Sequence, residues 1–322
     1  MRIIVKRIAL FAACLIASAA VAQAQNYPNR QIRLVVPFAA GGPADLLGRI
    51  IADEMGKDFG QQVYVDNRPG GNTIIGAELV AKADPDGYTL LMAIDGTLVM
   101  NPFLYSKLSY DPFKDFAPIS LVAEVPSVIE ANNGVKANTV QELIDQEKAK
   151  PGSLLTGYST PTSQVTAELL NMRAGIKLTL VPYRGGTTQV TGVLGGEIQL
   201  GFESVNVALP FAKAGKLKII ALTGGNRISL APDIPTVAET LPGFDLGIWQ
   251  SIVAPAGTPP EVVDKLHAEI VAVLARDTVR SKLTTAGIEP ASSKSPKDFA
   301  EFIRSQADTR RKVIEAVGIK LD

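Results

Sequence analysis

The residues that decide the fold are Pro37-Phe38-Ala39-Ala40-Gly41-Gly42-Pro43-Ala44-Asp45. The apolar run 32–36 precedes them, and apolar residues at helical spacing follow from Leu46. Proline is favoured at a first helical position, because its fixed φ suits the helix and an N–H would have no partner there. The stretch therefore predicts a strand, a glycine turn and a helix, the unit from which α/β domains are built.

The start of this predicted helix lacks a side-chain cap. The N-cap position falls on Gly42, which has no oxygen to accept hydrogen bonds from the free amides of the first turn. Free amides and the positive end of the helix dipole favour an anion. Two other helix starts, Thr258 with Glu261 and Ser295 with Asp298, carry capping pairs. The contrast makes the glycine turn a candidate anion site; the alternative is a tight turn that needs glycine for its backbone alone.

The first 24 residues have the features of a secretory signal peptide. Three basic residues precede a short apolar stretch, 8–21, and small residues mark a cleavage point after Ala24. The one cysteine, Cys14, lies inside this signal, so the mature chain is expected to have no disulfide, thiol nucleophile or thiolate metal site. Cleavage just before Cys14 to give a lipoprotein is the alternative. The sequence predicts a soluble protein exported to the periplasm.

Length and charge limit the architecture and the partners. Roughly 300 mature residues exceed what one hydrophobic core usually supports, which predicts two domains. The full chain has 32 basic and 32 acidic residues, and loss of the three basic residues of the signal leaves 29 against 32. A slightly acidic chain without a basic tract makes nucleic acid and anionic membranes poor partners.

Short β-rich runs alternate with amphipathic stretches, which predicts an α/β fold with parallel sheets covered by helices. The expected strands lie near 32–36, 62–66, 88–93, 126–131, 178–181, 198–201, 218–222 and 248–254. Long helices are expected near 260–275 and 297–317, and a loop at 101–116. Ligands of such folds bind beyond the carboxyl ends of strands. Loops rich in glycine and hydroxyl groups fall there, at 38–45, 67–75, 95–97, 158–163, 184–188 and 203–206.

Common enzyme signatures are absent from the sequence. It contains no dinucleotide fingerprint, no phosphate-binding P-loop and no serine-hydrolase elbow. The only histidine, His267, flanks the apolar side of an amphipathic helix, which favours a solvated helix histidine. One histidine and no mature cysteine cannot build a histidine-rich metal site, and nothing specifies an all-carboxylate one. We expect no catalytic residue, no metal and no cofactor.

Eight motifs, spread over essentially the whole mature chain, together carry a resemblance to a receptor family. Three of them read Asp66-Asn67-Arg68-Pro69-Gly70-Gly71, Ala83-Asp84-Pro85-Asp86-Gly87-Tyr88 and Pro232-Asp233-Ile234-Pro235-Thr236-Val237-Ala238-Glu239. The others lie at 27–45, 181–185, 194–198, 214–218 and 249–259. In this order they resemble the Bug family, the extracytoplasmic solute receptors of the tripartite tricarboxylate transporter system.

The resemblance implies a class II-like periplasmic binding protein, in which two α/β domains close on a ligand in the cleft between them and move about strand hinges. It implies a first domain of 25–123 plus 247–322 and a second of 124–246. The implied ligand is a small organic carboxylate, the implied partners are membrane transporter subunits, and the receptor acts as a monomer. The positions that match the family's ligand site are Phe38, Ala39, Ala40, Gly41, Gly42, Asp45, Asn72, Thr73, Gly96, Thr97, Ser159, Thr160, Thr162, Ser163, Arg184, Gly185, Gly186, Glu203 and Ser204.

Three departures from the family pattern concern the identity of the ligand. The segment 157–165 stands where members often have a Gly/Ser-rich loop followed by His-Leu, and Gln189-Val190 stands where many have Pro-Ala. Glu203 stands where aspartate is common.

Several candidate residues also have a structural interpretation. Thr160 can cap the helix that follows it, and Asp45 suits the first turn of any helix. Arg184 can bind a carboxylate directly or pair with Glu203 or Glu197. Trp249 can line the cleft or belong to the core.

Three functional hypotheses follow. The leading one is a receptor that captures a small organic acid and presents it to a membrane transporter. The second is a secreted lyase or hydrolase with Glu203 or Asp45 as a base. The third keeps the binding fold but has the protein report to a sensor kinase.

Overall fold

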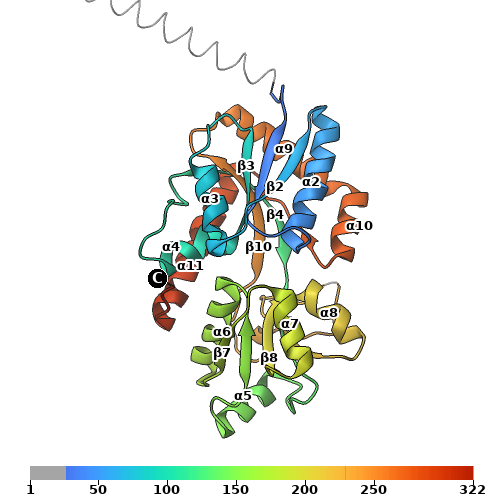
Figure 1. The fold of residues 1–322 in the computed structure, drawn as a ribbon, viewed down its shortest axis with the longest axis vertical. Coiled ribbons are helices and arrows are strands. Elements are labelled where there is room, and N and C mark those ends of the chain that lie inside the picture. Colours follow the sequence, from blue (N-terminus) through green and yellow to red (C-terminus); the bar gives the residue numbers. More distant parts are fainter. Residues whose placement is uncertain (1–26, 229, 322) are drawn as a thin grey trace, which may run out of the picture.

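The computed structural model describes residues 27–228 and 230–321. The predicted signal peptide lies outside the described residues. None of the helices in the described ranges combines the length and the apolar character that a membrane span requires. Figure 1 shows two lobes stacked along the long axis, each built on its own sheet.

The first lobe contains a six-stranded sheet of order β11-β4-β10-β3-β1-β2. Its strands are β1 (Ile32–Val36), β2 (Val63–Asn67), β3 (Thr89–Ile94), β4 (Phe116–Val125), β10 (Ile248–Pro255) and β11 (Glu289–Pro290). Its helices are α2 (Pro43–Phe59), α3 (Ile74–Ala81), α4 (Asn101–Leu104), α9 (Pro260–Ala275), α10 (Asp277–Thr285) and α11 (Pro296–Val317). A 3₁₀ turn, η1 (Gly71–Thr73), precedes α3, and a π-helical segment, η2 (Gly96–Met100), precedes α4.

The second lobe contains a five-stranded sheet of order β7-β6-β8-β5-β9. Its strands are β5 (Ser127–Ala131), β6 (Leu155–Tyr158), β7 (Thr179–Pro182), β8 (Leu200–Ser204) and β9 (Lys218–Leu222). Its helices are α5 (Val140–Ala149), α6 (Pro161–Ala174), α7 (Gly186–Gly195) and α8 (Val205–Lys213), with a 3₁₀ turn η3 (Val237–Glu239).

Strand β1 shows how the sequence builds the first lobe. Ile32, Leu34 and Val36 point to one face of the sheet and join the core beneath α2 and α9, while Val35 points to the opposite face and joins a second core. All four side chains are almost fully buried. A strand covered on both faces reads as a nearly continuous apolar run, and in 32–36 this run is interrupted by Arg33, which is half-buried and pairs with Asp66 of β2.

The predicted α/β class is confirmed, and the predicted parallel pairing is found for β1 with β2 and β3 and for β6 with β7 and β8, but each sheet is mixed. β10 runs antiparallel to β3 and β4, and β5 runs antiparallel to β8 and β9. The chain leaves the first lobe along β4, enters the second lobe along β5 and returns along β10 (Figure 1). Because β5 and β10 start at the junction between the lobes, they run opposite to strands that end there. The predicted domain boundaries stay a prediction.

Strands β4, β6 and β11 were not predicted. β4 contains Pro118, and the register with β10 shifts beside the Pro118 pairing, between Ile252 and Val253. Proline is tolerated in a sheet at such irregularities, so the presence of Pro118 does not exclude a strand here. In β6, Gly157 leaves room for neighbouring side chains: an added Cβ would lie 2.5 Å from Cδ1 of Ile198.

The two capping predictions had different outcomes. Ser295 caps α11 as predicted, because its side chain accepts a hydrogen bond from Asp298 N at 3.1 Å. The predicted cap at Thr258 is wrong, since α9 begins at Pro260 and Pro259 holds the N-cap position. The Thr258 hydroxyl instead donates to Pro255 O at 2.7 Å.

Candidate functional site

The glycine turn between β1 and α2 has an open helix start. Gly42 is the N-cap of α2 and no side chain caps this helix, as predicted. Gly41 has a φ of 90°, which requires glycine, and an added Cβ on Gly42 would meet only Ala39 O, at 3.9 Å. Ala39, Ala40 and Gly41 are exposed. The start of α2 therefore has room beside Gly42, although α9 shows that a helix without a side-chain cap is not unique to this loop.

Asp45 holds the glycine turn in place. Its carboxylate accepts hydrogen bonds from Gly41 N at 2.8 Å, Arg49 Nε at 3.0 Å and Asn67 Nδ2 at 2.9 Å. Burial alone would raise the pKa of Asp45, but these donors hold it below its ordinary value. Asn67 also donates to Phe38 O at 3.0 Å. Asp45 thus fixes the shape of the turn, and its oxygens face protein donors.

Two further loops of the first lobe meet each other. Asn72 and Thr73 have φ values of 51° and 76°, and the hydroxyls of Thr73 and Thr97 lie 2.8 Å apart. Thr97 and Gly96 belong to the π segment after β3 and are buried. Thr73 is buried as well, whereas Asn72 is exposed.

The side chains of the hydroxyl-rich loop before α6, in the second lobe, make three different kinds of contact. Thr160 and Ser163 form a capping box at the start of α6, which confirms the capping alternative for Thr160. The Ser159 hydroxyl donates to Glu203 Oε2 at 3.1 Å. Thr162 reaches the first lobe, where its hydroxyl donates to Asp95 Oδ2 at 3.1 Å.

Glu203 is the central charged group of the second-lobe cluster. Its Oε1 accepts hydrogen bonds from the backbone N–H and the hydroxyl of Ser204, both at 2.8 Å. Its carboxylate lies against Gly186 at the start of α7, since an added Cβ there would be 2.2 Å from Oε2. Burial raises the pKa of Glu203 despite the hydrogen bonds from Ser204 and Ser159.

Arg184 is exposed, and no ion pair or hydrogen bond within the described ranges engages its guanidinium. It therefore pairs with neither Glu203 nor Glu197 here. The next residue, Gly185, is the N-cap of α7 and provides no side-chain cap. Arg184 is the one cation among the predicted site residues, and it is free to turn toward a ligand.

Asp95 and Arg310 form a group between the two lobes; Asp95 belongs to the predicted ligand loop 95–97, but neither side chain was predicted as a site residue. Both side chains are buried, and Arg310 in α11 donates to the carbonyl oxygens of Asp245 and Gly247, just before β10. Burial raises the pKa of Asp95 to about 6, although Arg310 and Thr162 oppose this change. Burial likewise lowers the pKa of Arg310. The signal in the sequence was an acidic residue directly after the apolar strand at 89–94.

Glu130 and Gln189 form a second buried group near Glu203, and neither was predicted as a site residue. Glu130 on β5 is fully buried, and its Oε1 accepts a hydrogen bond from Gln189 Nε2 at 3.3 Å. Burial raises the pKa of Glu130 to about 8, and the Glu203 carboxylate adds to this effect. Gln189 also donates to Phe202 O, and it is one of the residues that depart from the family pattern.

Two other residues considered in the sequence have structural roles. Trp249 is buried and packs edge-on against Phe299 and Phe302 of α11, so it belongs to the core. His267 is half-buried, with Nε2 3.0 Å from Ser293 O.

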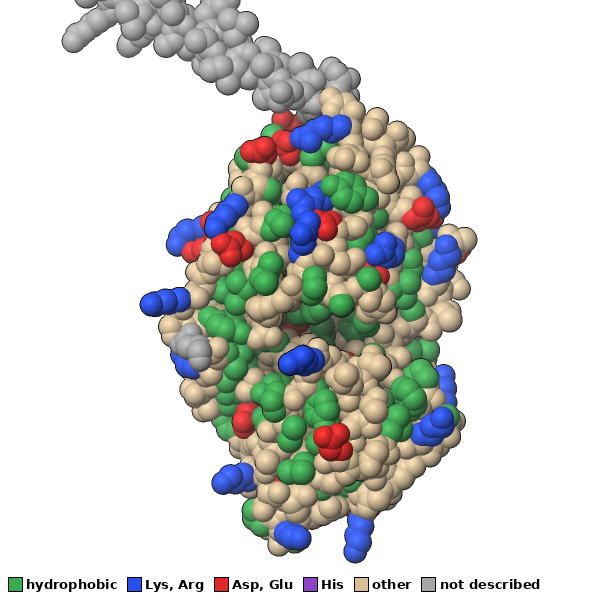
Figure 2. Space-filling model, viewed as in Figure 1, with side chains coloured by type: hydrophobic (Ala, Val, Ile, Leu, Met, Phe, Trp, Pro, Cys, Tyr) green, Lys and Arg blue, Asp and Glu red, His purple; other side chains and the backbone are tan. Residues whose placement is uncertain are grey.

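The predicted residues fall into two groups, one in each lobe, and Thr162 of the second lobe donates a hydrogen bond to Asp95 of the first. Figure 2 shows the surface hollowed where the lobes meet, with apolar side chains around the hollow. Backbone amides and neutral hydroxyls are the main donors here, which suits binding of an anion without transforming it. In 27–228 and 230–321, no three His, Cys, Asp or Glu side chains come close enough to hold a metal ion.

Comparison with known proteins places the chain in a family. The family model described as "Tripartite tricarboxylate transporter family receptor" matches residues 47–319. A UPF0065 protein of Bordetella bronchiseptica is 34% identical over 299 residues, which are 93% of this chain and 89% of that protein.

Two solved structures have the same fold over nearly their whole length. R. palustris Rpa4515 with adipate is 32% identical, with a TM-score of 0.85 over 92% of this chain and 99% of that one. MatC from Rhodopseudomonas palustris with bound malate is 31% identical, with a TM-score of 0.81 over 89% and 100%. The fold is the two-domain fold of periplasmic binding proteins. The chain belongs to the tripartite tricarboxylate transporter receptor family.

Proposed function

We propose that this protein is a periplasmic receptor that captures a small organic carboxylate between its lobes and delivers it to membrane transporter subunits. The observation that carries the proposal is the pair of facing loop groups, which offer neutral donors from both lobes. The adipate and malate in the two structural relatives support a carboxylate as the ligand. We further propose that the receptor acts as a monomer.

The mechanism we propose is closure of the two lobes on the ligand. The hydrogen bond between Thr162 and Asp95 joins the lobes directly, and Thr162 also lies 3.2 Å from the Met100 sulfur. Opening the lobes would separate these groups. A ligand that contacts both lobes binds the closed form more tightly, and this difference in affinity shifts the population toward closure.

The alternative of a secreted enzyme is not favoured. Asp45 accepts hydrogen bonds from protein donors, and Glu203 accepts them from Ser159 and Ser204. The family and the structural relatives are binding proteins.

We expect the purified protein to bind adipate or malate in a one-to-one ratio and to return the acid unchanged. Calorimetry measures the ratio, and mass analysis of the solution after incubation detects any product. A ligand that binds only the folded state raises the melting temperature. The diamide of the same acid should bind at least about tenfold more weakly, because its N–H groups face donors and leave them unpaired at about 1–3 kcal/mol each. Equal binding of acid and diamide, or any turnover, would contradict the proposal.

We expect export to remove residues 1–24, because small residues precede the cleavage point after Ala24. Intact-mass analysis of periplasmic protein should give a chain that starts at Gln25. A lipid-modified Cys14 would instead show that the protein is anchored to a membrane.

A further inference from the structure

The turn that begins at Gly70 has an uncommon backbone. Gly70, Gly71, Asn72 and Thr73 have φ values of 126°, 55°, 51° and 76° in succession. Glycine adopts positive φ easily and asparagine tolerates it, but a β-branched threonine does so only under strain. Such a conformation persists only where the surroundings hold it, and strained residues cluster at functional sites.

The buried side chain of Asn101 stabilises this turn through a hydrogen bond to its backbone. Asn101, at the start of α4, is fully buried and donates from Nδ2 to Asn72 O at 2.9 Å. The same Nδ2 lies 3.2 Å from the Tyr110 hydroxyl oxygen and donates to it. A buried amide in this arrangement fixes the carbonyl of Asn72, and with it the left-handed backbone of the turn.

The Tyr110 hydroxyl carries the connection to the π segment. It donates to Thr97 O at 2.6 Å, and Thr97 meets Thr73 through the two hydroxyls 2.8 Å apart. These hydrogen bonds therefore form a closed circuit that runs from the turn through Asn101 and Tyr110 to the π segment and back to the turn. A π segment is a rare conformation that occurs mostly at functional sites.

We propose that Asn101 and Tyr110 are positioning residues for the ligand site, which lock the left-handed turn and the π segment into one rigid unit. Neither residue is among the predicted ligand contacts. They act through Asn72, Thr73 and Thr97, so the inference rests on the proposed function for its effect on affinity. A preorganised unit avoids the cost of ordering these loops when the ligand binds.

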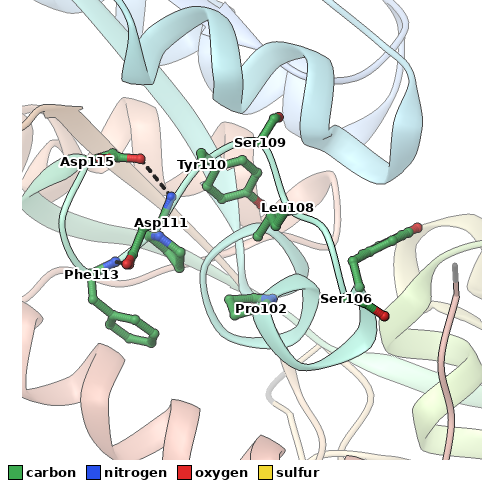
Figure 3. A pocket seen from close by; sticks show the side chains of 10 residues that line it. Pro102, Ser106, Leu108, Ser109, Tyr110, Asp111, Phe113 and Asp115 are labelled. Atoms are coloured by element: carbon green, nitrogen blue, oxygen red, sulfur yellow. Dashed lines mark hydrogen bonds between the residues drawn. The ribbon is translucent and has the colours of Figure 1, made fainter.

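The ring of Tyr110 also has a structural role that any test must separate from that of its hydroxyl. The ring packs edge-on against the ring of Phe116, with 5.8 Å between the ring centroids. It also helps to line an open pocket of about 520 Å³ formed by residues between 102 and 115 (Figure 3). Replacement by phenylalanine keeps the ring and removes only the hydroxyl. Tyr110→Phe is therefore the informative variant.

Tyr27→Phe is the matched control. The Tyr27 hydroxyl is also buried and donates to a backbone carbonyl of the same lobe, Gly87 O, at 2.7 Å. Tyr27→Phe removes one hydrogen bond to a backbone carbonyl, and Tyr110→Phe removes the same kind of bond together with the one accepted from Asn101, so we expect both to lower the melting temperature and Tyr110→Phe to lower it more. A purely structural role for Tyr110 would make the two variants alike in every other respect.

Hydrogen exchange of the ligand-free proteins tests the rigid unit directly. We expect Tyr110→Phe to speed exchange at least about tenfold in peptides that cover 70–74 and 96–101, and Tyr27→Phe to leave these peptides unchanged. With adipate or malate as the probe, Tyr110→Phe should lower affinity about tenfold and Tyr27→Phe should not.

The outcomes separate the two proposals. If the parent protein binds neither probe nor any other small carboxylate, the proposed function fails, while exchange still decides whether Tyr110 holds the unit. If the parent binds and Tyr110→Phe matches Tyr27→Phe in exchange or affinity, the positioning role is overturned.

Discussion

A Gly186→Ala variant is expected to lose carboxylate affinity by at least about 100-fold while staying folded. An added Cβ at this position would lie 2.2 Å from Oε2 and 2.5 Å from Cδ of Glu203. The carboxylate must turn aside, and it then loses its hydrogen bonds with Ser159 and Ser204, each worth about 1.5–3 kcal/mol. The displaced negative charge stays within the predicted site and repels a carboxylate ligand.

The fold should survive this change, because the group that moves is the end of a flexible side chain. We expect overpacking to lower the free energy of unfolding by about 1–3 kcal/mol. Gly195→Ala is the control at the other end of α7, where nothing lies within 4 Å of an added Cβ. It should keep the parent affinity for adipate or malate in calorimetry. Parent-like affinity in Gly186→Ala would show that the Glu203 cluster is not part of the ligand site.

A Glu130→Gln variant is expected to be more stable than the parent at alkaline pH. Glu130 Oε2 is buried and has no hydrogen-bond partner among the described residues, and burial raises the pKa of this carboxyl from 4.5 to about 8. The folded state therefore binds the proton more tightly than the unfolded state. The free energy of unfolding falls as pH rises from 4.5 through 8, and the loss is complete above 8.

A glutamine at position 130 can still accept the hydrogen bond from Gln189, but it has no carboxyl group to ionise. At about 1.4 kcal/mol for each pKa unit, the parent loses at most about 5 kcal/mol by pH 9, and we expect the variant to recover at least about 2 kcal/mol of this. At pH 4 the two proteins should be equally stable. Urea unfolding at pH 4, 7 and 9 measures the difference.

Glu147→Gln is the control for Glu130→Gln. Glu147 is also fully buried in the second lobe, but its carboxylate accepts hydrogen bonds from the backbone N–H groups of Gly152 and Leu154. A glutamine amide turns an N–H group against one of these donors, at about 1–3 kcal/mol. We expect Glu147→Gln to destabilise the protein at all three pH values. Destabilisation by Glu130→Gln at pH 9 would show that Glu130 is stabilising as a charged group.

Sequence patterns predicted the local elements well and the pairing of strands poorly. The strand at 32–36 and the helix at 260–275 have the predicted bounds, because each depends on residues within a few positions of one another. The strand Phe116–Val125 was missed, since its proline is acceptable only beside an irregular pairing with β10. That pairing depends on a segment far along the chain.

The sequence by itself determined the α/β class, the uncapped glycine turn before α2 and the cap at Ser295, because backbone preferences and capping act over a few residues. Only the tertiary structure decided which polar group serves which purpose. The Asp45 carboxylate accepts hydrogen bonds from its own loop, Thr162 reaches across to Asp95, and Arg184 has no partner among the residues that the structure describes. A side chain's partner is set by where distant segments meet, and that information is absent from the neighbouring residues of any one motif.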